Sequence, residues 1–429
     1  MRDIKDAVIE TEEIVETHTI VDTCRACGGR SLIPYLNLGY IPLVNRYLRK
    51  EDLSKSELSF PLQINYCKEC SMSQLSIVVN PHILFDEYYY RSSMSRTFQQ
   101  HCRKLAEDTK KRFALTNNSL VVEVASNDGI LLRELKATGV KFVGVEPAKN
   151  LAKIANSEGL TTHNAFWNNQ TASDVKSIYG SADVVVMQNV FAHIHDLDSA
   201  LSGVDDVLKD DGVLIIEVPY MISFINKTEF DTAYHEHLSY FLIRPLTFLF
   251  TRHNMTLFDV EEFDMHGGSV RVYVKKTRSN KNKVETEKIK KSLDLEEELG
   301  MYQIETYLRF SNHIAQIKSE LQLFLRGLKS RGQKIAAFGA SAKGNVLLNY
   351  CEIGKETIDY IIDETPEKQG KYYPGNHIPI ISPEVLRSSR PDYLVILPWN
   401  FVDEIISKTR HFKEAGGRYI IPIPALRII

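Results

Sequence analysis

Short apolar runs alternate with helical patterns through the middle of the chain. The apolar runs predict four strands, at Leu120–Ala125, Phe142–Glu146, Ala182–Gln188 and Val213–Val218. Between them, apolar residues recur at the three- and four-residue spacing of amphipathic helices, over Ile130–Thr138, Ala148–Ser157 and Leu197–Lys209. Strands that alternate with helices in this way predict a parallel sheet covered by helices.

The alternation ends with a different pattern. A helix near Pro245–His253 is followed by two closely spaced strands, Thr256–Phe263 and Ser269–Lys276. The link between them, Asp264–Gly268, is too short for a parallel crossover. We therefore expect these two strands to pair antiparallel.

The regions before and after this alternation differ from it. About residues 20–80 show little helical periodicity and contain several turn-forming glycines and prolines, and Asp86–Leu105 then predicts a helix. Residues 279–330 are rich in Lys, Glu and Leu, which favours charged helices that form a hinge or an oligomer contact. Their apolar positions at helical spacing are Tyr302, Leu308, Ile314, Ile317 and Leu321.

A second, smaller α/β alternation begins at Lys334 with a strand, a turn and a helix. Further strands are expected at Thr357–Asp363, Tyr393–Leu397 and Arg418–Ile423, with a helix near 401–414. The chain is therefore expected to hold two α/β units, preceded by a turn-rich region.

Composition narrows the classes of protein. The 429 residues are 43% hydrophobic, enough for ordinary globular cores, and carry 52 Lys and Arg against 55 Asp and Glu, a formal charge of −3. A protein that binds nucleic acid mainly through phosphate contacts is normally basic, so nucleic acid is disfavoured as the main partner. Apolar runs stay below the roughly 18 residues of a membrane span, and Met1–Glu13 lacks the apolar core of a signal peptide. We expect a cytoplasmic protein that does not act in a membrane.

Two CxxC pairs, Cys24/Cys27 and Cys67/Cys70, suggest a metal site. Two such pairs supply four thiolates, enough for a closed, structural tetrahedral zinc site, and the alternative is a set of buried, unligated cysteines. Cys102 and Cys351 lie in no such motif and are expected in the core.

A strand-to-helix turn is a candidate cofactor site. At such a turn, a nucleotide-like cofactor can meet backbone N–H groups if the side chains are small. At the end of the next strand, Glu146 can accept the hydroxyls of a ribose, and the alternative is a simple strand-end cap. The expected cofactor-binding residues are Glu123, Ala125, Ser126, Asn127, Gly129, Glu146, Pro147, Gln188 and Asn189.

Two polar clusters follow predicted strands, where open α/β sheets bind ligands. The first contains His193, and the second is the run Tyr234-His235-Glu236-His237. An imidazole can remove a proton at neutral pH with a carboxylate beside it. A second metal site on His235 and His237 is disfavoured because no HExxH-type spacing is present, and a solvent-exposed polar loop remains the other alternative.

Several motifs occur in one order along the chain. They are CRAC…CKEC, LFDEYYYRSSMS (84–95), VEVASNDGILL (122–132), NVFAHIHD, YHEHLSYF, HGGSVRVYV (266–274), FGASAKGNVLLNYC and DETPEKQGKYYPGNHIPI. With these motifs, over about residues 22–425, the chain resembles the sugar C-methyltransferases of deoxysugar biosynthesis. These enzymes use S-adenosylmethionine to methylate a ring carbon of a nucleotide-linked 4-keto hexose.

The resemblance implies an α/β protein of three domains with a helical linker. These are a zinc-binding domain at 20–83, a seven-stranded class I methyltransferase domain of Rossmann-like type at 84–278, a linker at 279–331, and a Rossmann-like domain at 332–429 that helps to bind the sugar nucleotide. It implies S-adenosylmethionine and structural Zn²⁺ as cofactors and a nucleoside diphosphate sugar as substrate. The expected assembly is a monomer or a small homo-oligomer.

The resemblance also assigns roles to residues. The family's base is the histidine of a Tyr-x-Glu-His motif, matching Tyr234, Glu236 and His237, and His193 matches a second family histidine. The expected substrate-binding residues are Tyr88, Tyr90, Ser92, Ser93, His266 and Lys343. Lys343, in the turn Gly339–Gly344, is expected to hold the diphosphate, the alternative being an exposed helix residue. Two positions depart from the family: Ala125 replaces a glycine and Ser341 a common proline.

The expected mechanism starts from carbon-acid chemistry. His237, held by Glu236, removes the hydrogen next to the ketone, and Tyr234 or His193 donates to the developing oxyanion. The alternatives are an O- or N-methyltransferase of the same fold, a zinc-ribbon RNA-binding methyltransferase or binding module, and a relative without cofactor.

Overall fold

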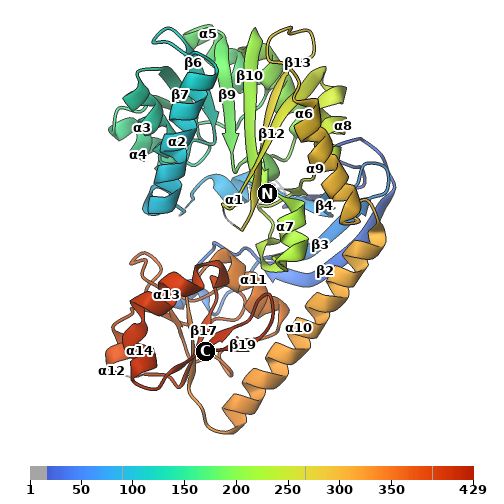
Figure 1. Cartoon of the computed structure of the whole chain (residues 1–429). Coiled ribbons are helices and arrows are strands. Elements are labelled where there is room, and N and C mark those ends of the chain that lie inside the picture. The colour runs from blue at the N-terminus through green and yellow to red at the C-terminus, as the bar shows by residue number, and fades with distance from the viewer. Residues whose placement is uncertain (1–16, 89, 266, 389) are drawn as a thin grey trace, which may run out of the picture.

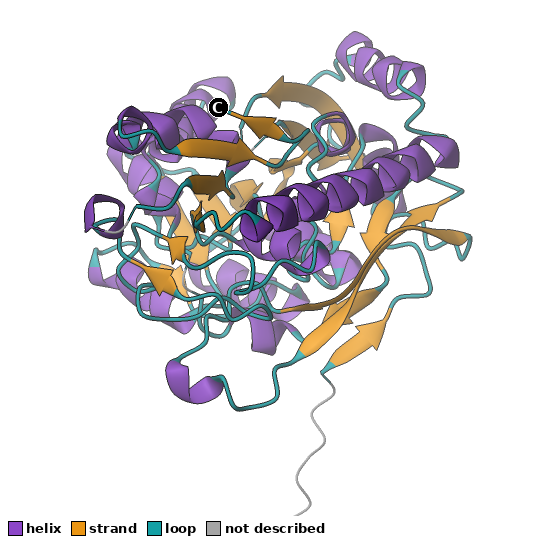
Figure 2. Ribbon diagram, turned by 90° about the horizontal axis from the view of Figure 1, so that it is seen from below, coloured by secondary structure: helices purple, strands orange, loops and turns teal. Residues whose placement is uncertain are grey.

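The structure, a computed structural model, describes residues 17–88, 90–265, 267–388 and 390–429. Its described strands form four sheets, and helices cover the larger ones (Figures 1 and 2). His266 is one of the positions outside the described residues, so its expected role stays untested.

The central sheet has seven strands in the order β12-β13-β10-β9-β6-β7-β8. Their bounds are β6 Leu120–Val124, β7 Lys141–Val145, β8 Thr162–His163, β9 Ala182–Gln188, β10 Leu208–Pro219, β12 Met255–Phe263 and β13 Ser269–Lys276. Only β13 runs antiparallel to its neighbours β10 and β12. The predicted parallel sheet and its antiparallel ending are confirmed.

Helices pack on both faces of this sheet because successive strand residues point to opposite sides. On β10, Val213 and Ile215 face the helices α2 (Arg96–Arg112), α3 (Ile130–Thr138) and α4 (Lys149–Ser157). Leu214 and Ile216 belong to the core on the other face, which is covered by α5 (Asn169–Tyr179), α6 (Leu197–Val207) and α8 (Ile243–Arg252). The short helix α7 (Met221–Asn226) follows β10.

The helix expected over Asp86–Leu105 is shorter at its start and longer at its end. α2 begins at Arg96, because the Ser95 side chain accepts from the Phe98 N–H and caps the helix. Before it lie α1 (Pro81–Phe85), a loop and the 3₁₀ turn η2 (Ser92–Met94). The polar groups of this loop bond to distant parts of the chain instead of to a helix of their own.

The N-terminal sheet takes one strand from a distant segment. Its order is β11-β4-β3-β2, all antiparallel, with β2 Leu32–Pro42, β3 Ser59–Cys67, β4 Ser73–Leu75 and β11 Ser239–Tyr240. Strands β1 (His18–Ile20) and β5 (Ile77–Val79) form a separate antiparallel pair. The 3₁₀ turn η1 covers Lys50–Asp52. Because β11 follows the Tyr-x-Glu-His run, this sheet reaches the candidate catalytic loop directly.

The charged region 279–330 forms α9 (Thr286–Glu298) and the long α10 (Ile304–Ser330), which runs from the central unit to the C-terminal one (Figure 1). Ile314, Ile317 and Leu321 are buried as expected, but Leu308 is 44% exposed and lies off the buried face. Glu296 of α9 is fully buried and accepts from the Ile243 N–H at the start of α8. These helices are therefore packed parts of the core, in contrast to a free hinge.

The C-terminal sheet has the order β16-β15-β14-β17-β18-β19, and only β19 is antiparallel. Its elements are β14 Ile335–Phe338, α11 Ala342–Tyr350, β15 Ile361–Ile362, β16 Ile380–Ile381, α12 Val385–Ser388, β17 Tyr393–Ile396, α13 Val402–Lys408, α14 Arg410–Glu414, β18 Arg418–Ile421 and β19 Arg427–Ile428. The strand expected at Thr357–Asp363 is reduced to two residues. The helix expected near 401–414 is broken at Thr409, whose hydroxyl bonds to the Ile405 carbonyl and Tyr419.

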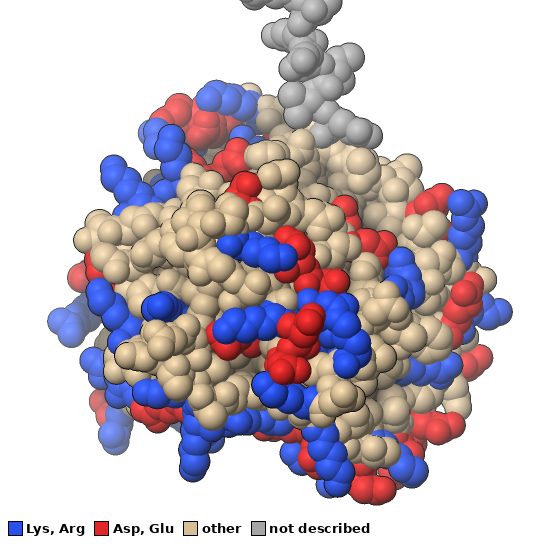
Figure 3. All heavy atoms as spheres, turned by 90° about the horizontal axis from the view of Figure 1, so that it is seen from above, with Lys and Arg blue, Asp and Glu red and all other residues tan. Residues whose placement is uncertain are grey.

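Two features of the described residues bear on membranes and on nucleic acid. Within the described ranges, none of the helices combines the length and apolar character needed to cross a membrane. On the face seen in Figure 3, basic and acidic side chains are interspersed. This face therefore lacks the continuous basic stripe typical of nucleic-acid binding.

Candidate active site and zinc centre

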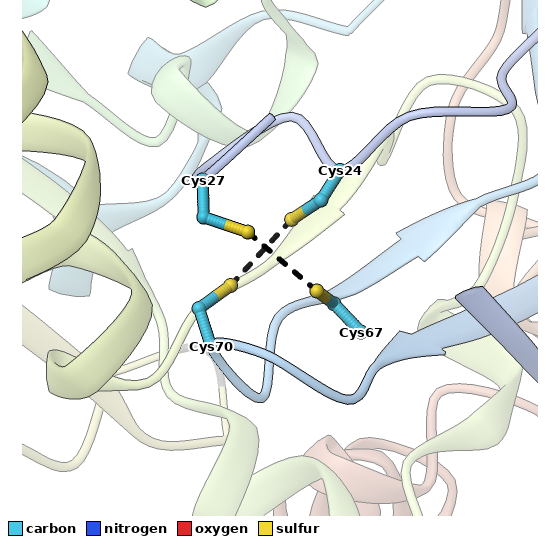
Figure 4. Close-up of side chains that lie close together, drawn as sticks. All are labelled: Cys24, Cys27, Cys67 and Cys70. Atoms are coloured by element: carbon cyan, nitrogen blue, oxygen red, sulfur yellow. Dashed lines mark hydrogen bonds between the residues drawn. The ribbon is translucent and has the colours of Figure 1, made fainter. Parts of the chain in front are cut away.

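The four cysteines of the CxxC pairs come together in one cluster. Their Sγ atoms lie within 4.8 Å of one another and point toward a common centre (Figure 4). Sγ of Cys24 lies 3.5 Å from that of Cys70, and Sγ of Cys27 lies 3.7 Å from that of Cys67. A tetrahedral site with Zn–S bonds of about 2.3 Å has sulfur–sulfur edges of about 3.8 Å. The cluster therefore fits a closed, structural zinc site, as expected.

The turn after β6 has the backbone of a glycine-rich loop. Ala125 and Asn127 adopt left-handed φ values of 53° and 52°, and Gly129 has a φ of 82°. A Cβ on Gly129 would lie 2.5 Å from Cδ1 of Leu160, so this glycine also permits close packing. Ala125 thus adopts the glycine-like conformation despite its methyl group.

Buried carboxyl groups surround this turn. Glu146 accepts from the N–H groups of Asn127 and Ala148, both at 2.8 Å, and burial raises its pKa to about 7. Burial, with the nearby Glu146, raises the pKa of Glu123 well above its usual range. Among the described residues, Glu123 Oε2 and Ser126 Oγ are buried without a hydrogen-bond partner. Because buried polar atoms are normally paired, these two fit a site that is completed by a polar ligand.

The other expected cofactor residues border the same turn. The Pro147 carbonyl accepts from Asn164 at 2.8 Å at the end of β7. Gln188 ends β9 and donates to Glu217 at 3.0 Å, and Asn189 follows it with a left-handed φ of 54°. They lie at the carboxyl ends of the strands, where open α/β sheets bind ligands.

Tyr88 and residues 90–93 contact both the cofactor turn and the Tyr-x-Glu-His run. Ser92 donates its N–H to Oδ1 of Asn127 at 2.9 Å, and Asn127 donates to the Tyr90 carbonyl at 3.2 Å. The Ser93 hydroxyl bonds to Asp128. At the other end, the Tyr88 hydroxyl donates to Oε2 of Glu236 at 2.7 Å. Since the backbone from Tyr88 to Ser92 spans at most about 14 Å, the two sites are neighbours.

The two candidate histidines face each other. The ring centroids of His193 and His237 are 4.8 Å apart, and those of Tyr234 and His237 are 4.0 Å apart. Nδ1 of His237 lies 2.7 Å from the Thr232 carbonyl oxygen, which can only accept. The proton of a neutral His237 is therefore on Nδ1 and the lone pair on Nε2, where a base needs it. Burial lowers the pKa of His193 to about 4, so this ring is neutral at pH 7.

Glu236 bonds to side chains of two distant segments. Its oxygens accept from the Tyr88 hydroxyl and from Nδ2 of Asn45, both at 2.7 Å, and Nδ1 of His237 bonds to the Thr232 carbonyl. The expected support of His237 by Glu236 stays a prediction. Burial raises the pKa of Glu236 to about 7. Its observed contacts make it an anchor for Tyr88 and for the N-terminal unit.

The rest of this run is packed against the N-terminal sheet. His235 is buried and its Nε2 lies 3.3 Å from the Phe60 carbonyl of that sheet. The run is therefore a largely buried loop and not a solvent-exposed one. Across the described ranges, the only group of three or more potential metal ligands is the cysteine cluster.

Comparison with known proteins decides the family. Three family models match in succession: a zinc binding domain at residues 24–85, a methyltransferase domain at 96–260 and a C-methyltransferase C-terminal domain at 264–424. The chain is 36% identical over 409 residues to the C-methyltransferase NovU of Streptomyces niveus, covering 95% of this chain and 97% of that protein. The chain belongs to the C-methyltransferase family.

Solved structures of lower similarity overlap part of this C-methyltransferase. The protein PH0226 of Pyrococcus horikoshii is 13% identical and covers 44% of this chain and 94% of its own, with a TM-score of 0.34. Magnesium protoporphyrin IX methyltransferase of Synechocystis, solved with bound S-adenosylmethionine, is 12% identical over 41% of this chain and 78% of its own, with a TM-score of 0.31. The assignment rests on the family models and the full-length relative: the chain is an S-adenosylmethionine-dependent C-methyltransferase.

Lys343, which was expected to hold a diphosphate, lies beside two carboxyl groups. Its Nζ is buried without a hydrogen-bond partner among the described residues and lies 5.1 Å from the Trp399 ring centroid. Trp399 donates to Asp231 at 2.7 Å. Burial raises the pKa of Glu229 to about 7 and that of Asp231 to about 6, and the nearby positive charge of Lys343 opposes both shifts. Lys343 is thus not an exposed helix residue, but two nearby carboxyl groups weaken its expected role toward a diphosphate.

Sequence reasoning missed several polar residues of this C-methyltransferase. Asn45 belongs to a turn in the N-terminal region and carries no local motif. Glu217 on β10 bonds to His101 at 2.8 Å and to Arg271 at 2.6 Å, beside Gln188. A charged residue inside an apolar strand run is the one signal that could have identified Glu217.

Proposed function

We propose that this C-methyltransferase methylates a ring carbon of a nucleotide-linked 4-keto deoxysugar. The observation that carries the proposal is the arrangement of His193, Tyr234 and His237, in which the Thr232 carbonyl leaves the His237 lone pair on Nε2. An oriented neutral imidazole beside further donors is what proton removal next to a ketone requires.

His237 performs the first step. Nε2 of His237 takes the proton from the ring carbon next to the ketone, and the electron pair of that C–H bond forms the enolate. The imidazolium that results is stabilised by the Thr232 carbonyl at Nδ1. S-Adenosylmethionine supplies the electrophilic methyl group that this enolate carbon requires.

His193 and Tyr234 act on the oxygen of the ketone. Burial raises the pKa of Tyr234 well above its usual range and lowers that of His193 to about 4. Both groups therefore stay neutral at pH 7, where each can donate a hydrogen bond to a developing oxyanion without carrying charge itself.

The cofactor is held by the turn 125–129 with Glu123 and Glu146, and the substrate by Tyr88, Tyr90, Ser92 and Ser93 and by the surroundings of Lys343. Among the described residues, Lys343 Nζ and one carboxyl oxygen each of Glu229 and Asp231 are buried without a hydrogen-bond partner, which supports a polar substrate at the border of the C-terminal unit. The zinc site is closed and takes no part in the reaction. Four free thiols as metal ligands also favour a reducing compartment, so we place the enzyme in the cytoplasm.

Exchange of the ring hydrogen tests the role of His237. In deuterated water, H237N is expected to lose at least about 100-fold in the exchange rate of a nucleoside diphosphate 4-keto-6-deoxyhexose, since a positioned base contributes about that much. H195N is the matched control, because His195 lies in the neighbouring loop. Undiminished exchange in H237N would remove it from the role of base, and a methyl signal on oxygen or nitrogen in the product would refute carbon methylation.

A further inference from the structure

Arg25 lies between two of the zinc ligands and reaches into the central unit. Its Nε donates to Oγ of Ser239 at 3.0 Å, and its Nη2 donates to the carbonyl of Ile194. The backbone N–H of Arg25 donates to Gln74 at 2.8 Å, which fixes the turn that carries it. One side chain therefore ties the turn Cys24–Cys27, hereafter the zinc turn, to two separate segments: the loop around Ile194 and the end of the Tyr-x-Glu-His loop, where β11 begins.

Both loops carry a candidate catalytic histidine. Ile194 directly follows His193, and Ser239 lies two residues after His237. The loops are also bonded to each other, since the Leu238 N–H donates to the Ala192 carbonyl at 2.9 Å. A guanidinium is planar and holds its donors at fixed angles, so it sets the separation of two acceptors, which a single ammonium cannot do.

A second arginine binds the same turn from another side. Nη1 of Arg252 on α8 donates to the Ala26 carbonyl at 2.7 Å, and its Nη2 pairs with Asp198 at 3.0 Å. Arg252, paired with Asp198, thus docks the zinc turn on α8 of the central unit, whereas Arg25 docks it on the neighbours of His193 and His237. It provides the matched control for Arg25.

We propose that Arg25 is a positioning residue that couples the zinc turn to the spacing of His193 and His237. Zinc fixes Cys24 and Cys27, the fixed turn places the guanidinium, and the guanidinium holds the Ile194 carbonyl and the Ser239 hydroxyl. The consequence for catalysis rests on the proposed function, because it assumes that the two histidines act on the substrate.

The test compares R25K, R25Q and R252Q in the full-length, zinc-loaded protein. Zinc content is measured by plasma emission, and the imidazole signals of His193 and His237 by NMR of the histidine-labelled protein, with H193N and H237N to assign them. We expect full zinc content in all three variants. Both histidine signals should shift in R25Q, one or both in R25K, and neither in R252Q.

Turnover is measured on the same variants with a nucleoside diphosphate 4-keto-6-deoxyhexose. A misplacement of about 1 Å costs about 100-fold in rate, so kcat should fall by about that factor in R25Q, less in R25K, and little in R252Q, at unchanged affinity for S-adenosylmethionine. Chelating zinc from the wild type should shift the same two histidine signals.

The outcomes separate the two proposals. Unchanged histidine signals in zinc-loaded R25Q or R25K overturn the positioning role, and so do equal shifts in R25Q and R252Q. Loss of zinc from both R25K and R25Q would make Arg25 part of the metal site's own stability and would also overturn it. Shifted signals with wild-type turnover would leave the coupling intact and contradict the catalytic role of the histidines.

Discussion

Glu236 shows how burial changes the chemistry of one carboxyl group. It is 4% exposed, accepts from Tyr88 and Asn45, and has a pKa of about 7 against an ordinary value of 4.5, because burial disfavours its charge. A group whose folded-state pKa is raised stabilises the fold at low pH, and this contribution disappears as the pH rises from about 4.5 through 7.

The variant E236Q should therefore lose this pH dependence. The neutral amide does not have to ionise in the core, so relative to wild type the free energy of unfolding of E236Q should improve by about 3 kcal/mol between pH 4.5 and 8. Urea unfolding at a series of pH values measures the difference, with E107Q on the exposed face of α2 as the control. Parallel pH curves for E236Q and wild type would contradict the prediction.

At the scale of single elements, the turn between β6 and α3 depends on Gly129. Gly129 combines a left-handed φ with close contact to Leu160. Gly139, at the other end of α3, also has a left-handed φ, of 78°, but a Cβ there would have no other atom within 4 Å. G139A should therefore lose only the conformational term of about 1 kcal/mol, and G129A should lose about 2–4 kcal/mol because it also displaces Leu160. Denaturant midpoints of the two variants check this order, and equal losses would refute the packing argument.

Elements with a local pattern were predictable from the sequence, and those defined by distant partners were not. α3 begins and ends at the predicted residues, and β9 and β13 also have their predicted bounds, because their apolar spacing is local. β11 is two residues long and exists only through pairing with β4, a strand that lies far earlier in the chain. The same reason explains the site: the cysteines and histidines stand in motifs, but Asn45, Arg25 and the Thr232 carbonyl contribute through contacts that no spacing reveals.

At the scale of the whole molecule, the zinc site stabilises a sheet that is shared between units. The four cysteines bring the start and the end of the turn-rich N-terminal region together. Strand β11, from the central unit, extends the sheet of this region. Structural zinc supplies much of the folding free energy of such small units. The loss of stability caused by removing the metal should therefore extend to the loop that carries His237.

Hydrogen exchange after chelation tests this reach. We expect faster amide exchange in β3, β4 and β11, while β14 and β17 of the C-terminal sheet keep their protection because they have their own core. Cadmium, which also binds four thiolates, should restore protection. Unchanged exchange in β11 after complete loss of metal would show that the sheet does not depend on the site.

The pairing of β11 with β4 also determines how the chain can be divided. A fragment that ends at residue 85 would keep the cysteine cluster but leave the backbone groups of Gln74 and Ser73 without their partners on β11. Open strand edges recruit other chains, so such a fragment is expected to self-associate even when fully loaded with metal. The N-terminal unit is therefore a poor candidate for transplantation into another protein, although its motif looks self-contained in the sequence.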